Sequence, residues 1–171
     1  MNPLPFSQPP SPLFLGIDFG TSGVRACVIS SSGEIDAFER VDFGRVEADE
    51  AAGLWSEALF SIIAAIPAGS RRRIAALALD GTSGTILACD EALNPTHPPL
   101  LYDDSRASAE SALIARAGGP DSPAASASSG LAKVLWLKAR LGLTRARLYL
   151  NQADWLTGLL SDRVGLSDYH N

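Results

Sequence analysis

Residues 13–30 constrain the fold more than any other stretch of this chain. They read LFLGIDFGTSGVRACVIS, which is two apolar runs separated by a turn of glycine and small hydroxyl residues. The pattern predicts a strand over Leu13–Phe19, a turn over Gly20–Gly23 and a second strand over Val24–Ser30. The fold is therefore expected to begin with a β-hairpin whose turn carries no bulky side chain.

That turn has the composition of an anion-binding loop. Backbone N–H groups of Gly20–Gly23 can approach a ligand closely, and consecutive N–H groups form a concavity that attracts anions. Asp18 ends the first strand, and its carboxylate can hold Mg²⁺ that bridges to phosphate oxygens. A plain hairpin in which Asp18 hydrogen-bonds its own turn is the alternative. The sequence has no Gly-Lys-[Ser/Thr], which excludes a Walker P-loop.

Composition narrows the partners. The 171 residues carry a net charge of −5, with 46% hydrophobic and 19% charged residues, which is typical of a globular domain. An acidic chain without a sustained basic face disfavours nucleic acids and anionic membranes as partners.

The cysteines and the N-terminal segment indicate the cellular compartment in which the protein is expected. Cys27 and Cys89 lie in apolar runs without disulfide or zinc spacing, so we expect buried thiols in a reducing cytoplasm. No apolar run is long enough to span a bilayer. Residues 1–12 are rich in proline and lack the features of a signal peptide, which predicts a flexible lead-in before a domain over 13–171.

The next elements define the fold class. Alternation over 35–43 predicts a third strand, and the apolar stripe over 47–66 predicts a helix with Trp55 in the core. The continuous apolar run over 74–79 predicts a parallel strand buried on both faces. The order is βββαβ, an α/β arrangement.

A second glycine and hydroxyl loop follows the buried strand. Residues 80–85 read DGTSGT and repeat the Gly-Thr-Ser-Gly of residues 20–23. Ligands of open α/β sheets bind at the carboxyl ends of strands, so we expect both loops to face one cleft. An ordinary turn is the alternative.

A third polar cluster, Asp103-Asp104-Ser105-Arg106, follows a short apolar run over 100–102. Carboxylates beside an arginine can bind the hydroxyls of a polyol through charge-assisted hydrogen bonds. Alternatively, Asp104 or Ser105 caps a helix over 106–117. Farther on, a helix is predicted over 130–141, with at least one of Lys133 and Trp136 exposed, and another over 151–162.

Taken together, these segments resemble the N-terminal part of the FGGY carbohydrate kinases, in particular the pentulose (D-ribulose and D-xylulose) kinase branch. The matching segments, in order, are GIDFGTSGVRACVI at 16–29, ALALDGTSGTILACD at 76–90, LLYDDSRA at 100–107, SSGLAKVLWL at 128–137 and ADWLTGLLSDRVGLSDYHN at 153–171. The resemblance implies a ribonuclease H-like fold of the actin and sugar-kinase type, with a βββαβα core. It also implies ATP as co-substrate, Mg²⁺ as cofactor and a ketopentose as the substrate that is phosphorylated.

Site residues follow from the same resemblance. Asp18 would hold Mg²⁺–ATP. Gly20, Thr21 and Ser22 would approach the transferred phosphate. Thr82 and Ser83 would touch the sugar, with Asp103, Asp104 and Arg106 nearby and Asp168 lining the same cleft.

The resemblance also implies that parts of the kinase are missing. The family's catalytic aspartate would lie beyond Asn171, as would the domain that holds most of the adenosine. We therefore expect an N-terminal kinase domain, incomplete at its C-terminal end, which is inactive alone and which pairs with a separate C-terminal half or self-associates through an uncovered face. The alternatives are a non-enzymatic sugar-binding remnant and an actin-like nucleotide-binding or assembly module, which would not need the cluster at 103–106.

Overall fold

The computed structural model describes residues 11–168, so the proline-rich lead-in predicted over residues 1–12 lies outside the described residues except for Ser11 and Pro12. The strands are β1 (Leu13–Phe19), β2 (Gly23–Ser30), β3 (Ile35–Asp42), β4 (Ile74–Gly81), β5 (Ile86–Cys89) and β6 (Leu148–Asn151). The helices are α1 (Ala48–Ala65), α2 (Ala68–Arg71), α3 (Ser108–Gly118), the 3-10 turn η1 (Pro123–Ala125), α4 (Gly130–Arg145) and α5 (Gln152–Ser161). None of the helices in this part of the chain is both long and apolar enough to cross a membrane.

The first half of the chain forms a four-stranded sheet with the order β3-β2-β1-β4. The three strands β1 to β3 form an antiparallel meander, and β4 returns parallel to β1 after α1. Burial alternates along β1, where Leu15 and Ile17 are buried and Phe14 and Asp18 are exposed. Helix α1 covers the buried face, with Trp55 among its core residues. The predicted βββαβ order is confirmed.

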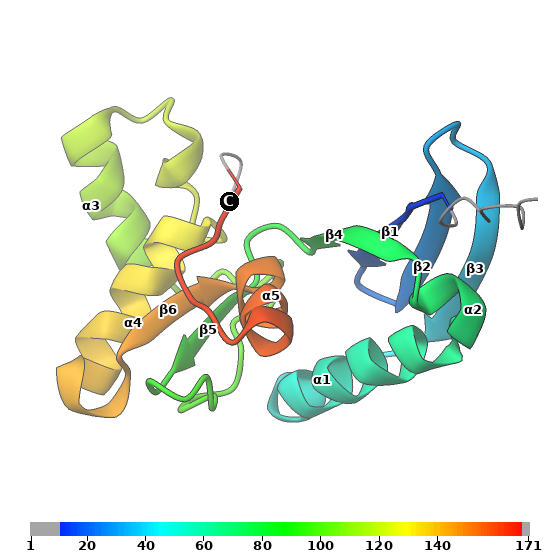
Figure 1. Ribbon diagram of the computed structural model, residues 1–171. Helices are drawn as coiled ribbons and strands as arrows, with labels where there is room; N and C mark the ends of the chain where they lie inside the picture. Colours follow the sequence, from blue (N-terminus) through cyan, green and yellow to red (C-terminus); the bar gives the residue numbers. More distant parts are fainter. Residues whose placement is uncertain (1–10, 169–171) are drawn as a thin grey trace, which may run out of the picture.

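The second half forms a smaller layered unit around the antiparallel pair β5–β6 (Figure 1). Ile86 and Ala88 of β5 belong to a core with α3 and α4. Leu87 and Cys89 belong instead to the core of the first sheet, together with Trp155 of α5. Strand β5 is therefore buried on both faces, and it joins the two halves into one packed structure.

Strand β4 differs from the sequence-based prediction. The run over 74–79 was expected to be buried on both faces, but residues 75–78 are exposed and the side chain of Leu77 is 40% exposed. Strand β4 lies at the edge of the sheet, and within residues 11–168 no strand pairs with its outer side. Its composition suits a central strand, but its position is that of an edge.

One prediction about the helices is also wrong, and one alternative is excluded. Lys133 and Trp136 of α4 are both buried, with 0% and 8% exposure, because α4 packs between β5 and the loop that precedes α3. Helix α3 begins at Ser108 with Ala107 at its N-cap, so neither Asp104 nor Ser105 caps it. The polar cluster at 103–106 is thus free of the capping role.

Candidate functional site

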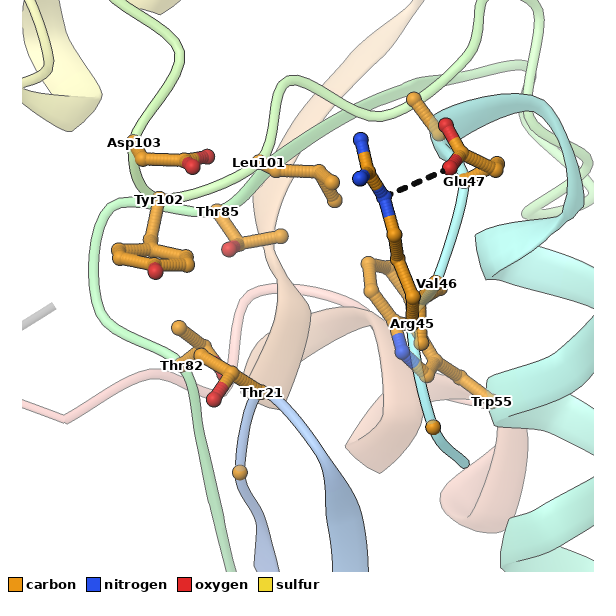
Figure 2. Close-up of a pocket in the computed structure, with 13 residues that line it drawn as sticks. Thr21, Arg45, Val46, Glu47, Trp55, Thr82, Thr85, Leu101, Tyr102 and Asp103 are labelled. Atoms are coloured by element: carbon orange, nitrogen blue, oxygen red, sulfur yellow. Dashed lines mark ion pairs between the residues drawn. The ribbon is translucent and has the colours of Figure 1, made fainter. Parts of the chain in front are cut away.

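A cavity of about 360 Å³ lies where the two halves of the chain meet. Its lining comes from the β1–β2 turn, the segment leading into α1, and two loops of the second half. The lining residues are Gly20, Thr21, Gly44–Ala48, Trp55, Thr82, Thr85, Leu101, Tyr102 and Asp103. Figure 2 shows Tyr102 and Asp103 on one side of this space, and Arg45 and Trp55 on the other. We call it the main cavity.

The β1–β2 turn presents backbone to the main cavity. A side chain at Gly23 would place its Cβ 2.5 Å from the carbonyl oxygen of Val41, so only glycine fits there. Gly20 donates its N–H to the carbonyl of Gly23 at 2.9 Å, which closes the turn tightly. Thr21 and Ser22 are exposed at its tip. The turn therefore places the backbone of Gly20 and Thr21 at the main cavity, with the N–H of Gly20 already bonded within the turn.

The loop after β4 is fixed to the sheet and to α5. The hydroxyl of Thr82 donates to the carbonyl of Phe19 at 3.2 Å, which joins this loop to the end of β1. The Thr82 N–H donates to Oε1 of the buried Gln152 at 2.7 Å, and the Gln152 N–H donates to Thr85. A Cβ at Gly81 would lie 3.0 Å from the backbone nitrogen of Ala153, so α5 approaches the loop closely. The loop is therefore held in place before any ligand arrives.

The cluster at 103–106 is divided between two roles. Asp103 is exposed and lines the main cavity, with its carboxylate directed inward in Figure 2. Asp104 instead pairs with Arg106, which donates to it from Nε at 2.9 Å and contacts it again through Nη2 at 2.7 Å. Burial alone raises the pKa of Asp104, but the hydrogen bonds and charge of Arg106, helped by Lys133, hold that pKa below its usual value. Asp104 and Arg106 thus shape the loop, and Asp103 faces the main cavity.

Asp18 lies on the other face of the sheet, away from the main cavity. It lines a second cavity of about 420 Å³ with Arg25, Cys27 and Asp80, and Arg25 approaches its carboxylate at 3.3 Å. No group of three or more His, Cys, Asp or Glu residues that could hold a metal ion occurs within residues 11–168. Two carboxylates, Asp18 and Asp80, do share this face, and Mg²⁺ needs only one or two when water and phosphate complete its shell. The two carboxylates fit a Mg²⁺ ion whose other ligands are water or phosphate oxygens.

The other predicted site residues lie elsewhere. Ser83 is exposed and lines a third cavity of about 450 Å³, which shares Tyr102 with the main cavity. Ser22 is exposed, and its carbonyl accepts from the N–H of Phe43. Asp168 is exposed in the segment after α5. The structure therefore brings Gly20, Thr21, Thr82 and Asp103 together, but not the remaining members of the predicted set.

Sequence reasoning missed several lining residues. Helical spacing predicts Trp55 only as a core residue, and with 4% exposure it also forms part of the cavity wall. Arg45 and Glu47 form an ion pair of 2.9 Å beside it. Tyr102 could have been found from its place directly before the polar cluster, whereas nothing in the periodicity of α1 distinguishes Trp55 from other core residues.

Comparisons with known proteins identify the fold. No family model matches the chain. Among solved structures, the xylulose kinase from Bifidobacterium adolescentis matches with a TM-score of 0.68 at 18% identity, covering 93% of this chain and 36% of the kinase. The xylulose kinase from Rhodospirillum rubrum matches with a TM-score of 0.69 at 14% identity, covering 88% of this chain and 35% of the kinase. The Plasmodium falciparum glycerol kinase with ADP matches with a TM-score of 0.67 at 11% identity, covering 89% of this chain and 35% of the kinase.

The chain therefore has the α/β fold of the sugar kinases. Its structural neighbours are xylulose kinases and other carbohydrate kinases, so the predicted resemblance is confirmed at the level of the fold. The chain spans about a third of the length of these kinases.

Proposed function

We propose that this chain is the N-terminal lobe of an ATP-dependent kinase that phosphorylates a ketopentose such as D-ribulose or D-xylulose. The observation that carries the proposal is the main cavity. There, the backbone of a phosphate-type turn at Gly20–Thr21 meets the hydroxyl and carboxylate groups of Thr82, Thr85 and Asp103. A transferred phosphate and a polyhydroxylated acceptor need these two kinds of surface close together.

Each group has a role in this proposal. The N–H groups at the tip of the β1–β2 turn would bind the transferred phosphate, whereas the N–H of Gly20 closes the turn on Gly23. Asp103 and the threonine hydroxyls bind sugar hydroxyls, and Tyr102 and Trp55 supply apolar surface for its carbon skeleton. Asp18 would hold Mg²⁺ on the other face of the sheet, so it would meet only those phosphates that extend past the β1–β2 turn toward that face. Free Cys27 and Cys89 fit a reducing cytoplasm as the location.

Turnover is a separate part of the proposal. A general base must accept the proton of the attacked hydroxyl, and Asp104 is committed to Arg106 in this structure. We propose that the base and most of the adenosine site belong to the remaining two thirds of the kinase. The 171-residue chain alone would then bind ligands with at most vestigial turnover.

The proposal is tested by ligand binding and ADP release with the purified chain. Calorimetry with D-ribulose, D-xylulose and glycerol measures sugar affinity, and a coupled assay with Mg²⁺–ATP measures turnover. Asp18→Ala and Asp103→Ala probe the two surfaces, and Asp121→Ala, an exposed loop carboxylate, is the matched control. We expect ketopentose binding that is lost in Asp103→Ala, with very slow ADP release.

The other outcomes separate the alternatives. Sugar binding that is unaffected by nucleotide and by Asp18→Ala would favour a non-enzymatic sugar-binding remnant. Nucleotide-driven assembly without sugar binding would favour an actin-like module. Rapid sugar-dependent ADP release that vanishes in Asp18→Ala would place a working base within these residues.

A further inference from the structure

Lys133 is the most unusual buried group of the described chain. Its side chain has no exposed surface, although it carries an ammonium group. All three of its N–H donors are used on backbone carbonyls, those of Gly84 at 2.7 Å, Leu101 at 2.6 Å and Tyr102 at 3.1 Å. A lysine is almost never fully buried without such partners.

The three carbonyls come from two separate loops. Gly84 belongs to the loop after β4, which contributes Thr82 and Thr85 to the main cavity. Leu101 and Tyr102 belong to the loop before α3 and line the same cavity directly. One side chain from α4 therefore joins the two loops that form one wall of the cavity.

The surroundings of this charge act in opposite directions, and the net result is a Lys133 pKa below the usual value of a lysine. Desolvation lowers the pKa of Lys133, while the carboxylates of Asp104 and Asp103 act against that shift. Gly84 has a φ of +73°, and a Cβ there would lie 3.3 Å from the carbonyl oxygen of Ser128. The carbonyl of Gly84 is thus directed at Lys133 by a backbone conformation that only glycine adopts easily.

A second residue of α4 acts on the same loop. Trp136, one turn after Lys133, lies under the guanidinium of Arg106 at 5.2 Å and of Arg140 at 4.0 Å. Because Arg106 holds Asp104, the ring supports the end of the loop while Lys133 holds its beginning. Helix α4 is thus a platform for residues 101–106.

We propose that Lys133 is a positioning residue for the sugar, whose ammonium ties the loop at 81–85 and the loop at 101–106 into one preformed binding surface. The proposal rests on the proposed function, because it names what orients the sugar-facing groups. Lys133 does not touch the sugar. It acts through the backbone that carries Thr82, Tyr102 and Asp103.

The chain offers matched controls. It has two lysines, and Lys138 lies exposed on the same helix. Lys133→Met keeps the length of the side chain but removes the charge and the donors, and Lys138→Met makes the same change at the surface. Leu137→Ala removes apolar volume from the same buried core, where Leu137 has 0% exposure, and it controls for a general loss of stability.

The first measurement is amide hydrogen exchange without ligand. In Lys133→Met, we expect exchange at both loops, 81–85 and 101–106, to rise together by about tenfold or more, because buried carbonyls lose their partner. Lys138→Met should leave both loops unchanged. The proposal is overturned if exchange in Lys133→Met rises in neither loop, or rises no more than in a Leu137→Ala variant of equal melting temperature.

The second measurement is ketopentose affinity by calorimetry. Lys133→Met should bind about tenfold or more weakly than the wild type, while Leu137→Ala and Lys138→Met retain wild-type affinity. Equal affinity in Lys133→Met and the wild type contradicts the positioning role, as does equal weakening in Lys133→Met and Leu137→Ala. A wild-type chain that binds no sugar overturns the proposed function, and with it the substrate role of Lys133.

Discussion

Asp18 and Asp80 lie directly opposite each other in the parallel register of β1 and β4. Both carboxylates are on the open face of the sheet, in the second cavity. The guanidinium of Arg25 lies 3.3 Å from the carboxylate of Asp18 and offsets its negative charge. Oδ1 of Asp80 accepts a hydrogen bond from the N–H of Gly81 at 2.8 Å. Two neighbouring carboxylates with one arginine leave excess negative charge, which a divalent cation would neutralise.

The first prediction concerns that charge. Without divalent ions, Asp80→Asn should raise the free energy of unfolding by about 0.5 kcal/mol or less, because like charges on paired strands repel and the pair is exposed. With nucleotide present, Mg²⁺ should raise the melting temperature of the wild type, but not that of Asp18→Asn. Thermal unfolding with and without Mg²⁺ measures both effects. An identical Mg²⁺ response in Asp18→Asn and in the control Asp121→Asn would contradict the assignment.

The second prediction concerns Asp104. Its folded-state pKa lies below the unfolded value of about 3.9, so its stabilising contribution is present above that pH and is lost as pH falls through the folded pKa. Asp104→Asn should cost about 1 kcal/mol near neutral pH, because Arg106 is half exposed. Urea unfolding at about pH 6 and about pH 3 should show the difference from wild type shrinking in acid. If the difference in the free energy of unfolding stayed constant over this pH range, the Asp104–Arg106 ion pair would not be its cause.

The third prediction concerns the two thiols. Burial, reinforced by Asp90, raises the pKa of Cys89 to about 12, so its thiolate is scarce at neutral pH. Cys27 is half-buried and lines the second cavity. A thiol reagent should label the native chain rapidly at Cys27 and slowly at Cys89. Cys27→Ser should therefore remove the rapid phase of the labelling reaction. Equal labelling rates at both cysteines would show that the core around β5 opens readily.

The fourth prediction concerns the edge of β4. Charged side chains and prolines usually protect an exposed edge strand from pairing with another chain. Residues 74–79 contain neither. We expect concentration-dependent self-association, and Leu77→Lys should weaken it about tenfold or more by placing charge on that edge. Sedimentation velocity measures this effect, and Leu131→Lys, at an exposed leucine of α4, is the control. Equal loss of association in both variants would place the contact elsewhere.

The elements that were predicted well depend on local patterns. Alternation in β1 and β2 and the helical stripe of α1 follow from side-chain direction over a few residues. The observed bounds of β1 are the predicted ones, and those of β2 and α1 differ from the prediction by one residue at one or both ends. The glycine and hydroxyl loops were also found, because turn chemistry is visible in composition.

The errors arose where burial depends on distant neighbours. The apolar run of β4 predicts a central strand, but its exposure depends on whether another strand pairs with it. Lys133 has the charge of a surface residue, yet its three carbonyl partners lie 31 to 49 positions earlier in the chain. Helical periodicity is a pattern of neighbouring residues, so it gives no information about partners that far away in the chain.

The sequence by itself determined the strand and helix pattern and the two loops that carry glycine and hydroxyl residues, because these depend on local conformational preferences. Only the tertiary structure decided that Thr21, Thr82 and Asp103 share a cavity while Asp18 faces the other side of the sheet. It also decided that Gln152 and Lys133 hold the loops in place. Contacts between residues so far apart form only when the two halves pack around β5, and local patterns carry no record of that packing.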